Sequence, residues 1–348
     1  MKQISKFLPF ILTVLFTNCK IFAQQKDDFT AKIDSLIKTT NPRPFNGVIL
    51  ITQKGKTKYS KAFGYSNLEK KTPLTTKDNF IIMSNSKQIT AVLILKEVEK
   101  GKIDLQSPVR KYLPNLQQTW ADTVTVHQLL NFSAGITDID SPLLFKPGTD
   151  FKYGNTTYVM LGKIIENITG RKYIDVANEL FKDLKMKNTF CFEHGKVQNR
   201  VQGYRNANNI FTVEENPIDN NEMVPAAGII SNLKDLNIWD MKLHNGKILK
   251  PETYKLMTAY TITAQHNAFG KEKIGYGYGI RISDKTPVKY LGHTGGGSGF
   301  VTFKIYFPET GVDVIVLENQ SNENIDLFYE FEIKIREIVM NSNLVKKI

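Results

Sequence analysis

The chain has 348 residues, of which 41% are hydrophobic and 23% are charged. This composition is typical of a globular protein and excludes an intrinsically disordered one. The formal net charge is +12, but the lysines are scattered along the chain and no motif for reading nucleic acid is present. We therefore expect a basic, solvated surface and no nucleic-acid partner.

Residues 1–23 have the features of a signal peptide. Lys2 and Lys6 precede an apolar run over residues 7–16, and Ala23 is a small residue at the expected cleavage position. The apolar run is far shorter than the roughly 20 residues that a membrane-spanning helix needs, and no later stretch reaches that length, so no transmembrane segment is predicted. We expect a secreted or periplasmic protein.

The two cysteines bear on export and on stability. Cys19 is a candidate for lipid attachment after cleavage, but residues 16–18 before it differ from the Leu and small residues usual at such sites. Cleavage before Gln24 is therefore favoured, and lipoprotein anchoring through Cys19 is the alternative. Loss of residues 1–23 leaves Cys191 as the only cysteine, so no internal disulfide is expected in the mature chain.

Strand signals lie at both ends of the chain. Residues 47–51 and 57–63 read as strands joined by a Lys-Gly-Lys turn, which predicts an antiparallel hairpin. Toward the other end, the pattern predicts three more strands and a closing helix, over residues 276–282, 300–307, 312–317 and 326–340 respectively.

Mostly helical signals fill the region between. Residues 89–95 form an apolar run that ends at Gly101, which predicts a helix that is apolar on nearly every face and therefore buried. A second helix is predicted from residue 156 to Gly170. The predicted fold class is a mixed α/β (α+β) fold, in which helices flank an antiparallel sheet built from both chain ends. A mostly helical lobe is inserted over roughly residues 102–270 of one domain that spans 24–348.

Ser84 and Lys87 are spaced as a nucleophile and a base. At the start of a helix, a spacing of three puts the hydroxyl and the amine on one face, one turn apart. Burial disfavours the ammonium form of a lysine, and a neutral amine is a competent base. The same spacing recurs at residues 35–38 and 231–234, but only Ser84 lies between a probable sheet strand and the most apolar helix.

Two further motifs follow in the chain. Tyr-x-Asn occurs three times, and only Tyr153 and Asn155 precede a strong helix; the other two matches lie at residues 65–67 and 204–206. His-Thr-Gly occurs once, at residues 293–295, against the strand predicted from Phe300. Three motifs in this order, each in its expected context, form a specific signal for acyl transfer by serine.

The set resembles the serine β-lactamase and penicillin-binding-protein superfamily, in the branch of class C β-lactamases, D-alanyl-D-alanine carboxypeptidases and related esterases. The resemblance covers roughly residues 45–319, with further family-like segments at 84–91, 101–105, 147–149, 184–189 and 227–231. It implies the β-lactamase/transpeptidase-like fold, with the site in the cleft between the sheet and the helical lobe.

The resemblance also implies a role for each motif residue. Ser84 would be acylated, and Lys87 and Tyr153 would share the proton transfers, with the choice of acylation base between them left open. The backbone N–H groups of Ser84 and Gly296 would form the oxyanion hole. Asn155 would bind the substrate's amide, and the carboxylate end of the substrate would face a run of three residues, His293, Thr294 and Gly295.

Three departures from the family pattern bear on the substrate. Met83 stands where the family usually has glycine, residues 131–133 are Asn-Phe-Ser in place of Thr-His-Thr or Thr-His-Ser, and His293 replaces the lysine of class C β-lactamases. A lysine keeps a permanent charge opposite a β-lactam carboxylate, whereas a histidine is mostly neutral near pH 7. We therefore expect peptidase or esterase activity rather than efficient β-lactam hydrolysis, with a preference for carboxylate substrates that rises toward pH 6.

Other enzyme classes fit the sequence less well. The five histidines show no metal-ligand spacing, so no metal site is predicted, and His127 is interpreted as a structural helix residue. The glycine run over residues 295–299 lacks the phosphate-loop pattern, so no cofactor is expected. The G-x-S-x-G elbow of α/β-hydrolases does not occur in the sequence.

The sequence thus predicts a serine hydrolase that acts through an acyl-enzyme on Ser84. Its substrates would be small molecules or peptides, peptidoglycan-derived ones among them: D-amino-acid-containing peptides, small amides or esters. The alternative is a catalytically weak penicillin- or peptidoglycan-binding protein or sensor. Intact Ser84, Lys87 and Tyr153 favour the enzyme, because a binding protein has no need of all three.

Overall fold

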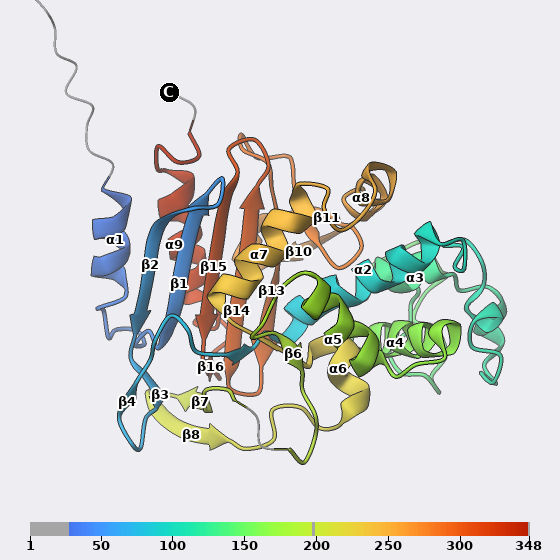
Figure 1. Ribbon diagram of the computed structural model, residues 1–348, viewed down its shortest axis with the longest axis horizontal. Coiled ribbons are helices and arrows are strands. Elements are labelled where there is room, and N and C mark those ends of the chain that lie inside the picture. Colours follow the sequence, from blue (N-terminus) through green and yellow to red (C-terminus); the bar gives the residue numbers. More distant parts are fainter. Residues whose placement is uncertain (1–27, 197–198, 347–348) are drawn as a thin grey trace, which may run out of the picture.

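A computed structural model describes residues 28–196 and 199–346, so the predicted signal peptide lies outside the described residues. An eight-stranded sheet runs through the molecule in the order β10-β11-β12-β13-β14-β15-β1-β2 (Figure 1). All its neighbouring strands are antiparallel. The strands are β1 (Gly47–Gln53), β2 (Lys56–Phe63), β10 (Ile262–His266), β11 (Gly270–Tyr276), β12 (Arg281–Ser283), β13 (Tyr290–Gly297), β14 (Phe300–Phe307) and β15 (Val312–Glu318).

Strand β1 shows why the central strands are apolar at almost every position. Successive side chains of a strand point to opposite faces of the sheet, and here both faces are covered. Val48 and Leu50 belong to one hydrophobic core and Ile49 and Ile51 to the other. Because β1 pairs with β15, the hairpin near the N-terminus and the strands near the C-terminus form one sheet, which confirms the predicted fold class.

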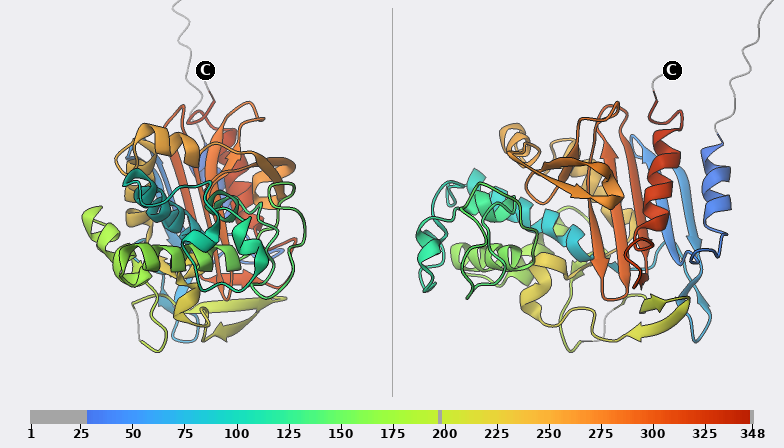
Figure 2. Two further views of the ribbon diagram at one scale, coloured as in Figure 1. Left: turned by 90° about the vertical axis from the view of Figure 1, so that its right-hand side faces the viewer. Right: turned by 180° about the vertical axis from the view of Figure 1, so that it is seen from behind.

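Helices α1 (Phe29–Leu36) and α9 (Glu330–Met340) lie side by side on one face of the sheet (Figure 2). Ile33 of α1 and Ile335 of α9 are completely buried in the core beneath them. The opposite face carries α7 and the helical lobe (Figure 1). The helices on this side are α2 (Ser86–Glu99), α3 (Val126–Leu130), α4 (Thr156–Thr169), α5 (Tyr173–Asp183), α6 (Val224–Ala227), α7 (Leu233–His244) and α8 (Pro251–Met257).

Helix α2 lies between the sheet and the lobe and is buried along most of its length, as its apolar sequence predicts. One of its buried polar side chains, Gln88, has its partners inside the protein. The Oε1 atom of Gln88 accepts hydrogen bonds from Nε1 of Trp239 at 2.6 Å and from Nζ of Lys304 at 3.3 Å. These bonds tie α2 to α7 and to β14, because a buried amide oxygen must find donors within the protein.

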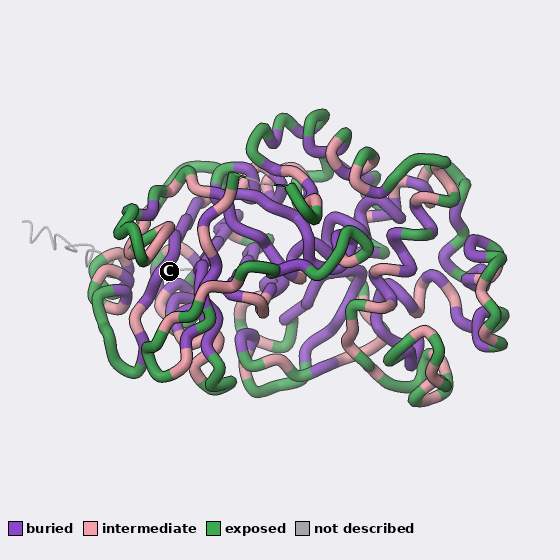
Figure 3. The backbone as a smooth tube through the Cα atoms, turned by 90° about the horizontal axis from the view of Figure 1, so that it is seen from below, coloured by how far each residue is buried: buried purple, intermediate pink, exposed green. Residues whose placement is uncertain are grey.

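Three smaller sheets complete the fold. Their strands are β3 (Tyr65–Asn67) with β4 (Thr72–Pro73), β5 (Phe80–Ile81) with β9 (Ile229–Ser231) and β6 (Phe190–Cys191), and β16 (Gln320–Asn322) with β7 (Gly203–Ala207) and β8 (Ile210–Glu214). Buried backbone occupies the middle of the molecule, and exposed backbone the outer turns (Figure 3). Over residues 28–196 and 199–346, none of the helices is long and apolar enough to cross a membrane.

The structure differs from the predicted elements at three places. Residues 276–282 are not one strand, because Gly279 takes a φ of +64° in a tight turn that separates β11 from β12. The last helix begins at Glu330 rather than at residue 326, and the carbonyl of Leu327 before it accepts a hydrogen bond from Nε of Arg43 at 2.8 Å. The stretch 102–270 also holds strands β6–β9, and β10 returns to the main sheet at residue 262.

Candidate active site

Ser84 lies in a short 3₁₀ turn (Met83–Asn85) that leads directly into α2. Its side chain is partly exposed, whereas Met83 and Asn85 on either side are buried. The turn is held from β14 by Thr302, whose Oγ1 donates to the carbonyl of Ile82 at 2.8 Å and accepts from Nδ2 of Asn85 at 2.8 Å. Ser84, the predicted nucleophile, is therefore fixed at the junction of the sheet and the buried helix.

Lys87 stands one turn further along α2 and is completely buried. Its Nζ lies 3.0 Å from Oγ of Ser84 and donates hydrogen bonds to Oδ1 of Asn155 at 2.8 Å and to the carbonyl of Ala226 at 3.0 Å. Burial lowers the pKa of Lys87 to about 7, because a charged amine is costly away from water. The amine is thus close to half neutral near physiological pH.

Tyr153 completes this group. The centre of its ring lies 5.0 Å from Nζ of Lys87, and Phe132 packs against it with ring centres 4.5 Å apart. Burial raises the pKa of Tyr153 to about 12, although a hydrogen bond with Ser84 and the charge of Arg281 act in the opposite direction. The phenol therefore stays protonated near neutral pH.

Asn155 is the residue before α4 and reaches the same site. Its Oδ1 accepts from Lys87, so its Nδ2 donor remains for another acceptor. The structure thus brings Ser84, Lys87, Tyr153 and Asn155 together, although residues 84 and 155 lie far apart in the sequence.

The His-Thr-Gly motif lies on β13, which runs against the turn that carries Ser84. A Cβ atom on Gly295 would lie 2.4 Å from the carbonyl oxygen of Ile82 and 2.8 Å from Cβ of Met83. Only glycine lets the strand and the turn approach this closely. The strand then continues into Gly296, whose predicted oxyanion-hole partner, the backbone N–H of Ser84, lies on that neighbouring turn.

Met83 itself has a φ of +48°, a left-handed backbone conformation that glycine adopts at no steric cost. This is the position at which the family usually has glycine. This conformation costs a residue other than glycine a few kcal/mol at most. The side chain of Met83 is buried, and its packing offsets part of that cost.

His293 is buried, with 1% of its surface exposed, and both of its ring nitrogens already have partners inside the protein. Nε2 lies 2.9 Å from the hydroxyl of Tyr276, and Nδ1 lies 2.6 Å from the carbonyl of Thr294. Burial and the neighbouring charge of Arg281 hold the pKa of His293 well below its usual value of 6.5. The expectation that His293 gains charge toward pH 6 is therefore contradicted, because its surroundings keep the ring neutral.

A buried positive charge that sequence reasoning did not identify lies near Tyr153, on Arg281 of β12. Its guanidinium lies 5.9 Å from the ring centre of Tyr153 and 5.3 Å from that of Tyr276. Only 4% of Arg281 is exposed, and its Nε and Nη1 atoms have no hydrogen-bond partner. Sequence reasoning missed this residue because it belongs to no motif and its strand was misplaced.

Two more polar residues border the same part of the site. His266 at the end of β10 contacts Thr294, with Nε2 and Oγ1 3.1 Å apart. Tyr329 stands just before α9, and its hydroxyl lies 2.9 Å from where a Cβ on Gly296 would be. Sequence reasoning noted His266 only as one of five histidines without metal-ligand spacing, and the sequence held no signal for Tyr329.

The other matches to the motifs lie elsewhere in the fold. Ser35 is on α1, and Ser231 is buried on β9, where its hydroxyl lies 2.8 Å from that of Thr189. Tyr204 of β7 accepts a hydrogen bond from the backbone N–H of Leu68 at 2.9 Å. His127 on α3 contacts Tyr278, with Nδ1 2.7 Å from the hydroxyl. None of these residues lies in the group formed by Ser84, Lys87, Tyr153 and Asn155.

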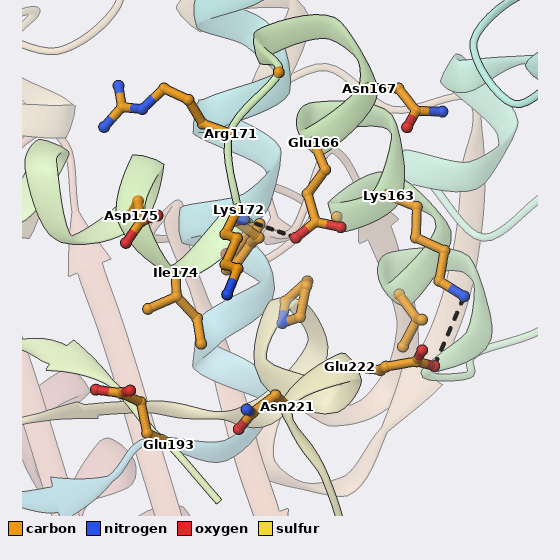
Figure 4. Close-up of a pocket in the computed structure, with 15 residues that line it drawn as sticks. Lys163, Glu166, Asn167, Arg171, Lys172, Ile174, Asp175, Glu193, Asn221 and Glu222 are labelled. Carbon is orange, nitrogen blue, oxygen red and sulfur yellow. Dashed lines mark hydrogen bonds and ion pairs between the residues drawn. The ribbon is translucent and has the colours of Figure 1, made fainter.

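A pocket of about 940 Å³ opens on the lobe between α4, α5 and α6 (Figure 4). It contains none of the motif residues. Its charges are partly satisfied within the protein, since Lys163 pairs with Glu222 at 3.7 Å and Glu166 accepts the backbone N–H of Tyr173 at 2.9 Å. This pocket is therefore separate from the Ser84 site. Among residues 28–196 and 199–346, no group of three or more metal-ligating side chains gathers.

Comparisons with known proteins agree with this geometry. The beta-lactamase family model matches residues 39–332. Protein flp of Staphylococcus aureus (strain MW2) is 26% identical over 310 residues, which cover 81% of this chain and 61% of that protein. This chain thus spans about three fifths of the length of that curated relative.

Solved structures give the same picture. An octameric penicillin-binding protein homologue from Pyrococcus abyssi superposes with a TM-score of 0.75 at 26% identity, covering 91% of this chain and 77% of that one. A D-amino acid amidase from Ochrobactrum anthropi SV3 shares the fold with a TM-score of 0.77 at 22% identity, covering 90% and 99%. The chain belongs to the beta-lactamase family, whose fold is that of serine hydrolases.

Proposed function

We propose that this protein is an acyl-enzyme serine hydrolase that cleaves D-amino-acid-containing peptides, small amides or esters bearing a carboxylate next to the scissile bond. The observation that carries the proposal is the position of the Lys87 amine. It is fully buried, has a pKa of about 7, and lies 3.0 Å from the hydroxyl of Ser84.

The partners of Lys87 orient its lone pair. The Oδ1 atom of Asn155 and the carbonyl of Ala226 can only accept hydrogen bonds. A neutral amine therefore uses its two hydrogens on them, and its lone pair is left to face the hydroxyl of Ser84. Tyr153 has a pKa of about 12 and is protonated. We assign the acylation base to Lys87.

The reaction then follows in balanced steps. Lys87 takes the Ser84 proton while Oγ bonds to the substrate's acyl carbon, and the backbone N–H groups of Ser84 and Gly296 stabilise the oxyanion. When the bond to the leaving nitrogen or oxygen breaks, Tyr153 gives that atom its proton and regains one from Lys87. A water molecule next loses a proton to the same pair of residues and bonds to the acyl carbon. The bond from that carbon to Oγ of Ser84 then breaks, the acyl group leaves as the acid, and Oγ takes the proton back from Lys87 and Tyr153.

Arg281 supports a substrate that carries a negative charge. A buried guanidinium with unpartnered N–H groups is unfavourable by itself, and an anion relieves that cost. A carboxylate fits two of its donors side by side. Since Arg281 lies beside Tyr153, the group that donates to the leaving atom, the carboxylate belongs to the leaving portion of the substrate. A C-terminal D-amino acid has this arrangement.

The names of the similar proteins support the same substrate class, since one is a penicillin-binding protein homologue and another a D-amino acid amidase. Peptides that contain D-amino acids occur in the bacterial cell envelope. The basic, apolar start of the chain supports export to the periplasm or cell exterior, where such peptides would be met.

The test uses the purified protein with a D-Ala-D-Ala peptide, a chromogenic cephalosporin and a short-chain p-nitrophenyl ester. We expect steady turnover of the peptide, slower turnover of the ester, which lacks the carboxylate, weak turnover of the cephalosporin, and one covalent fluorophosphonate label on the peptide that contains Ser84. Ser84→Ala should abolish both turnover and labelling. Stoichiometric acylation without turnover would instead favour the penicillin- or peptidoglycan-binding alternative, and labelling at Ser231 or Ser35 would refute the site.

A further inference from the structure

His266 links the carboxylate end of the site to a neighbouring turn. Its Nδ1 accepts a hydrogen bond from the backbone N–H of Ala268 at 3.3 Å, and its Nε2 lies 3.1 Å from Oγ1 of Thr294. His266 is a partly exposed residue at the end of β10, whereas Thr294 on β13 is 97% buried, with 3% exposed. Neither sequence motif nor family resemblance assigns a role to His266.

The two contacts define which ring nitrogen carries the proton. A backbone N–H can only donate, so Nδ1 of His266 must be the unprotonated, accepting nitrogen. In the neutral ring the proton then lies on Nε2, which donates to Oγ1 of Thr294. Burial and the nearby Arg281 lower the pKa of His266 to about 3, so the ring keeps this form at physiological pH.

The tautomer of His266 in turn directs the hydroxyl of Thr294. An oxygen that accepts from Nε2 cannot point its own hydrogen at that nitrogen, so the hydroxyl hydrogen must be aimed elsewhere. The other polar neighbour of Thr294 is the hydroxyl of Tyr329, which can donate as well as accept. Burial raises the pKa of Tyr329 and the bond with Thr294 acts in the opposite direction, so the Tyr329 oxygen accepts the Thr294 hydrogen in the absence of substrate. A carboxylate that enters near Arg281, whose charge also reaches His266, is a stronger acceptor and takes over that hydrogen.

We propose that His266 is a positioning residue, which turns the hydroxyl of Thr294 into a hydrogen-bond donor for the substrate carboxylate held by Arg281. This inference rests on the proposed function, because it needs a carboxylate at that place. It adds a specificity-determining contact that the motif residues alone do not contain. Two groups would bind the substrate carboxylate, the Arg281 guanidinium and the Thr294 hydroxyl, and His266 on β10 sets the direction of that hydroxyl.

A structural role for His266 can be separated from this one. Its Nδ1 caps the turn over Asn267–Phe269, and its ring packs against Tyr329 with centres 5.3 Å apart. Both of those contacts would stabilise the fold for any substrate. The Nε2 contact acts on Thr294 alone, so it should change the selectivity between anionic and neutral substrates.

The experiment measures kcat/KM for a D-Ala-D-Ala peptide with a free C-terminal carboxylate and for the same peptide with a C-terminal methyl ester. The ratio of the two values reports recognition of the anion. His266→Phe keeps a ring but loses the N–H donor and should lower the ratio about tenfold, the effect expected of a hydrogen bond to a charged group. His266→Gln restores an N–H near the place of Nε2 and should keep the ratio within about twofold of the wild type.

Two comparisons test the route through Thr294. Thr294→Val should lower the ratio as much as His266→Phe does, and the double variant should lower it no further, because both changes remove one interaction. His194→Phe, at an exposed histidine away from the site, should leave the ratio unchanged. An unchanged ratio in His266→Phe, or a fully additive fall in the double variant, would overturn the inference.

The failure of the inference and that of the proposed function give different results. If the wild type prefers the carboxylate and Arg281→Leu removes that preference while His266→Phe does not, only the role of His266 is wrong. If the wild-type ratio is about one and Arg281→Leu leaves it there, the carboxylate site itself is wrong. In case His266→Phe does not fold, nitrogen NMR of the wild-type histidines, with His266→Gln identifying the signal, must show a neutral Nε2–H ring. An Nδ1–H ring would overturn the inference without any further variant.

Discussion

The amine of Lys87 contacts the hydroxyl of Ser84 at 3.0 Å from a position that water does not reach. This relationship joins the reactivity of the serine to the burial of the lysine, because burial lowers the pKa of the amine from 10.5 to about 7. The neutral fraction of Lys87 therefore changes most steeply near pH 7.

The first prediction concerns this pH dependence. The rate of acylation of Ser84 by a neutral ester should rise with pH through about 7 and then level off, as Lys87 loses its proton. Lys87→Met should lower the rate by about a hundredfold to ten-thousandfold, the usual contribution of a positioned base. The measurement is kcat/KM from pH 5.5 to pH 9. Tyr153→Phe should be slower but keep the inflection near pH 7; an inflection that follows Tyr153 instead would assign the base to the phenol.

The second prediction concerns Arg281. Arg281→Leu should reduce kcat/KM for a substrate with a free carboxylate by about a hundredfold, since an ionic hydrogen bond to a buried cation contributes roughly 1.5–3 kcal/mol. The same substrate with a methyl ester should be affected far less. Arg205→Leu, at an exposed arginine paired with Glu214, serves as the matched control. Equal losses on both substrates would mean that Arg281 supports the fold and not the anion.

The third prediction concerns His293. Because its pKa is held well below 6.5, the wild-type ratio of carboxylate to neutral-ester activity should not change between pH 6 and pH 8 through this residue. His293→Lys would place an amine in a buried position beside Arg281, and we expect a lower melting temperature rather than better use of a cephalosporin. Thermal unfolding and the two kcat/KM values at both pH values check this. A gain on the cephalosporin alone would restore the reading of His293 as a carboxylate contact.

The fourth prediction concerns the contact between β13 and the Ser84 turn. Gly295→Ala would place a Cβ atom 2.4 Å from the carbonyl oxygen of Ile82 and 2.4 Å from Oγ1 of Thr302, so the strand or the turn must move. Displacement of about 1 Å at a catalytic site costs roughly a hundredfold in rate. In Gly154→Ala the new Cβ meets no atom within 4 Å, and its melting temperature should stay near that of the wild type. A fully active Gly295→Ala would show that the contact does not fix Ser84.

The fifth prediction concerns two buried carboxyl groups behind α2. Asp240 accepts from Lys304 of β14 at 2.5 Å, and Asp313 of β15 lies beside it and accepts from Nδ2 of Asn237 at 2.7 Å. Burial and the neighbouring Asp240 raise the pKa of Asp313 well above its usual value of 3.8. The folded chain therefore keeps a proton on Asp313 that the unfolded chain loses above about pH 4. Because the folded state binds more protons, the free energy of unfolding falls as pH rises from about 4 toward the pKa of Asp313 in the folded chain.

Asp313→Asn should remove that dependence, because an amide donates to Asp240 without needing a bound proton. Relative to the wild type, its free energy of unfolding should gain about 1–2 kcal/mol between pH 5 and pH 8, since one pKa unit corresponds to about 1.4 kcal/mol. Urea unfolding at the two pH values measures this. Asp219→Asn, at an exposed position, should show no such change. If Asp313→Asn changes the free energy of unfolding by the same amount at both pH values, the folded chain does not keep a proton on Asp313.

The sequence by itself determined those features that depend on short spacing. Ser84 and Lys87 lie one helical turn apart, and the apolar run after them specifies a buried helix, so the contact between these two side chains and the helix that carries Lys87 were predictable from local periodicity. The antiparallel hairpin over β1 and β2 was equally predictable, because its turn residues and alternating strands are local signals.

Tertiary structure alone decided which charges act at the site. Arg281, His266 and Tyr329 come from β12, β10 and the segment before α9, and no motif joins them. Only the folding of the sheet brings His266 and Tyr329 to Thr294 and the charge of Arg281 within reach of both. Likewise, no sequence pattern reports how far a side chain is removed from water. That removal lowers the pKa of Lys87 to about 7 and keeps His293 uncharged, and it leaves Arg281 as a buried cation with unpartnered N–H groups, which is why we propose Arg281 rather than the motif histidine as the carboxylate contact.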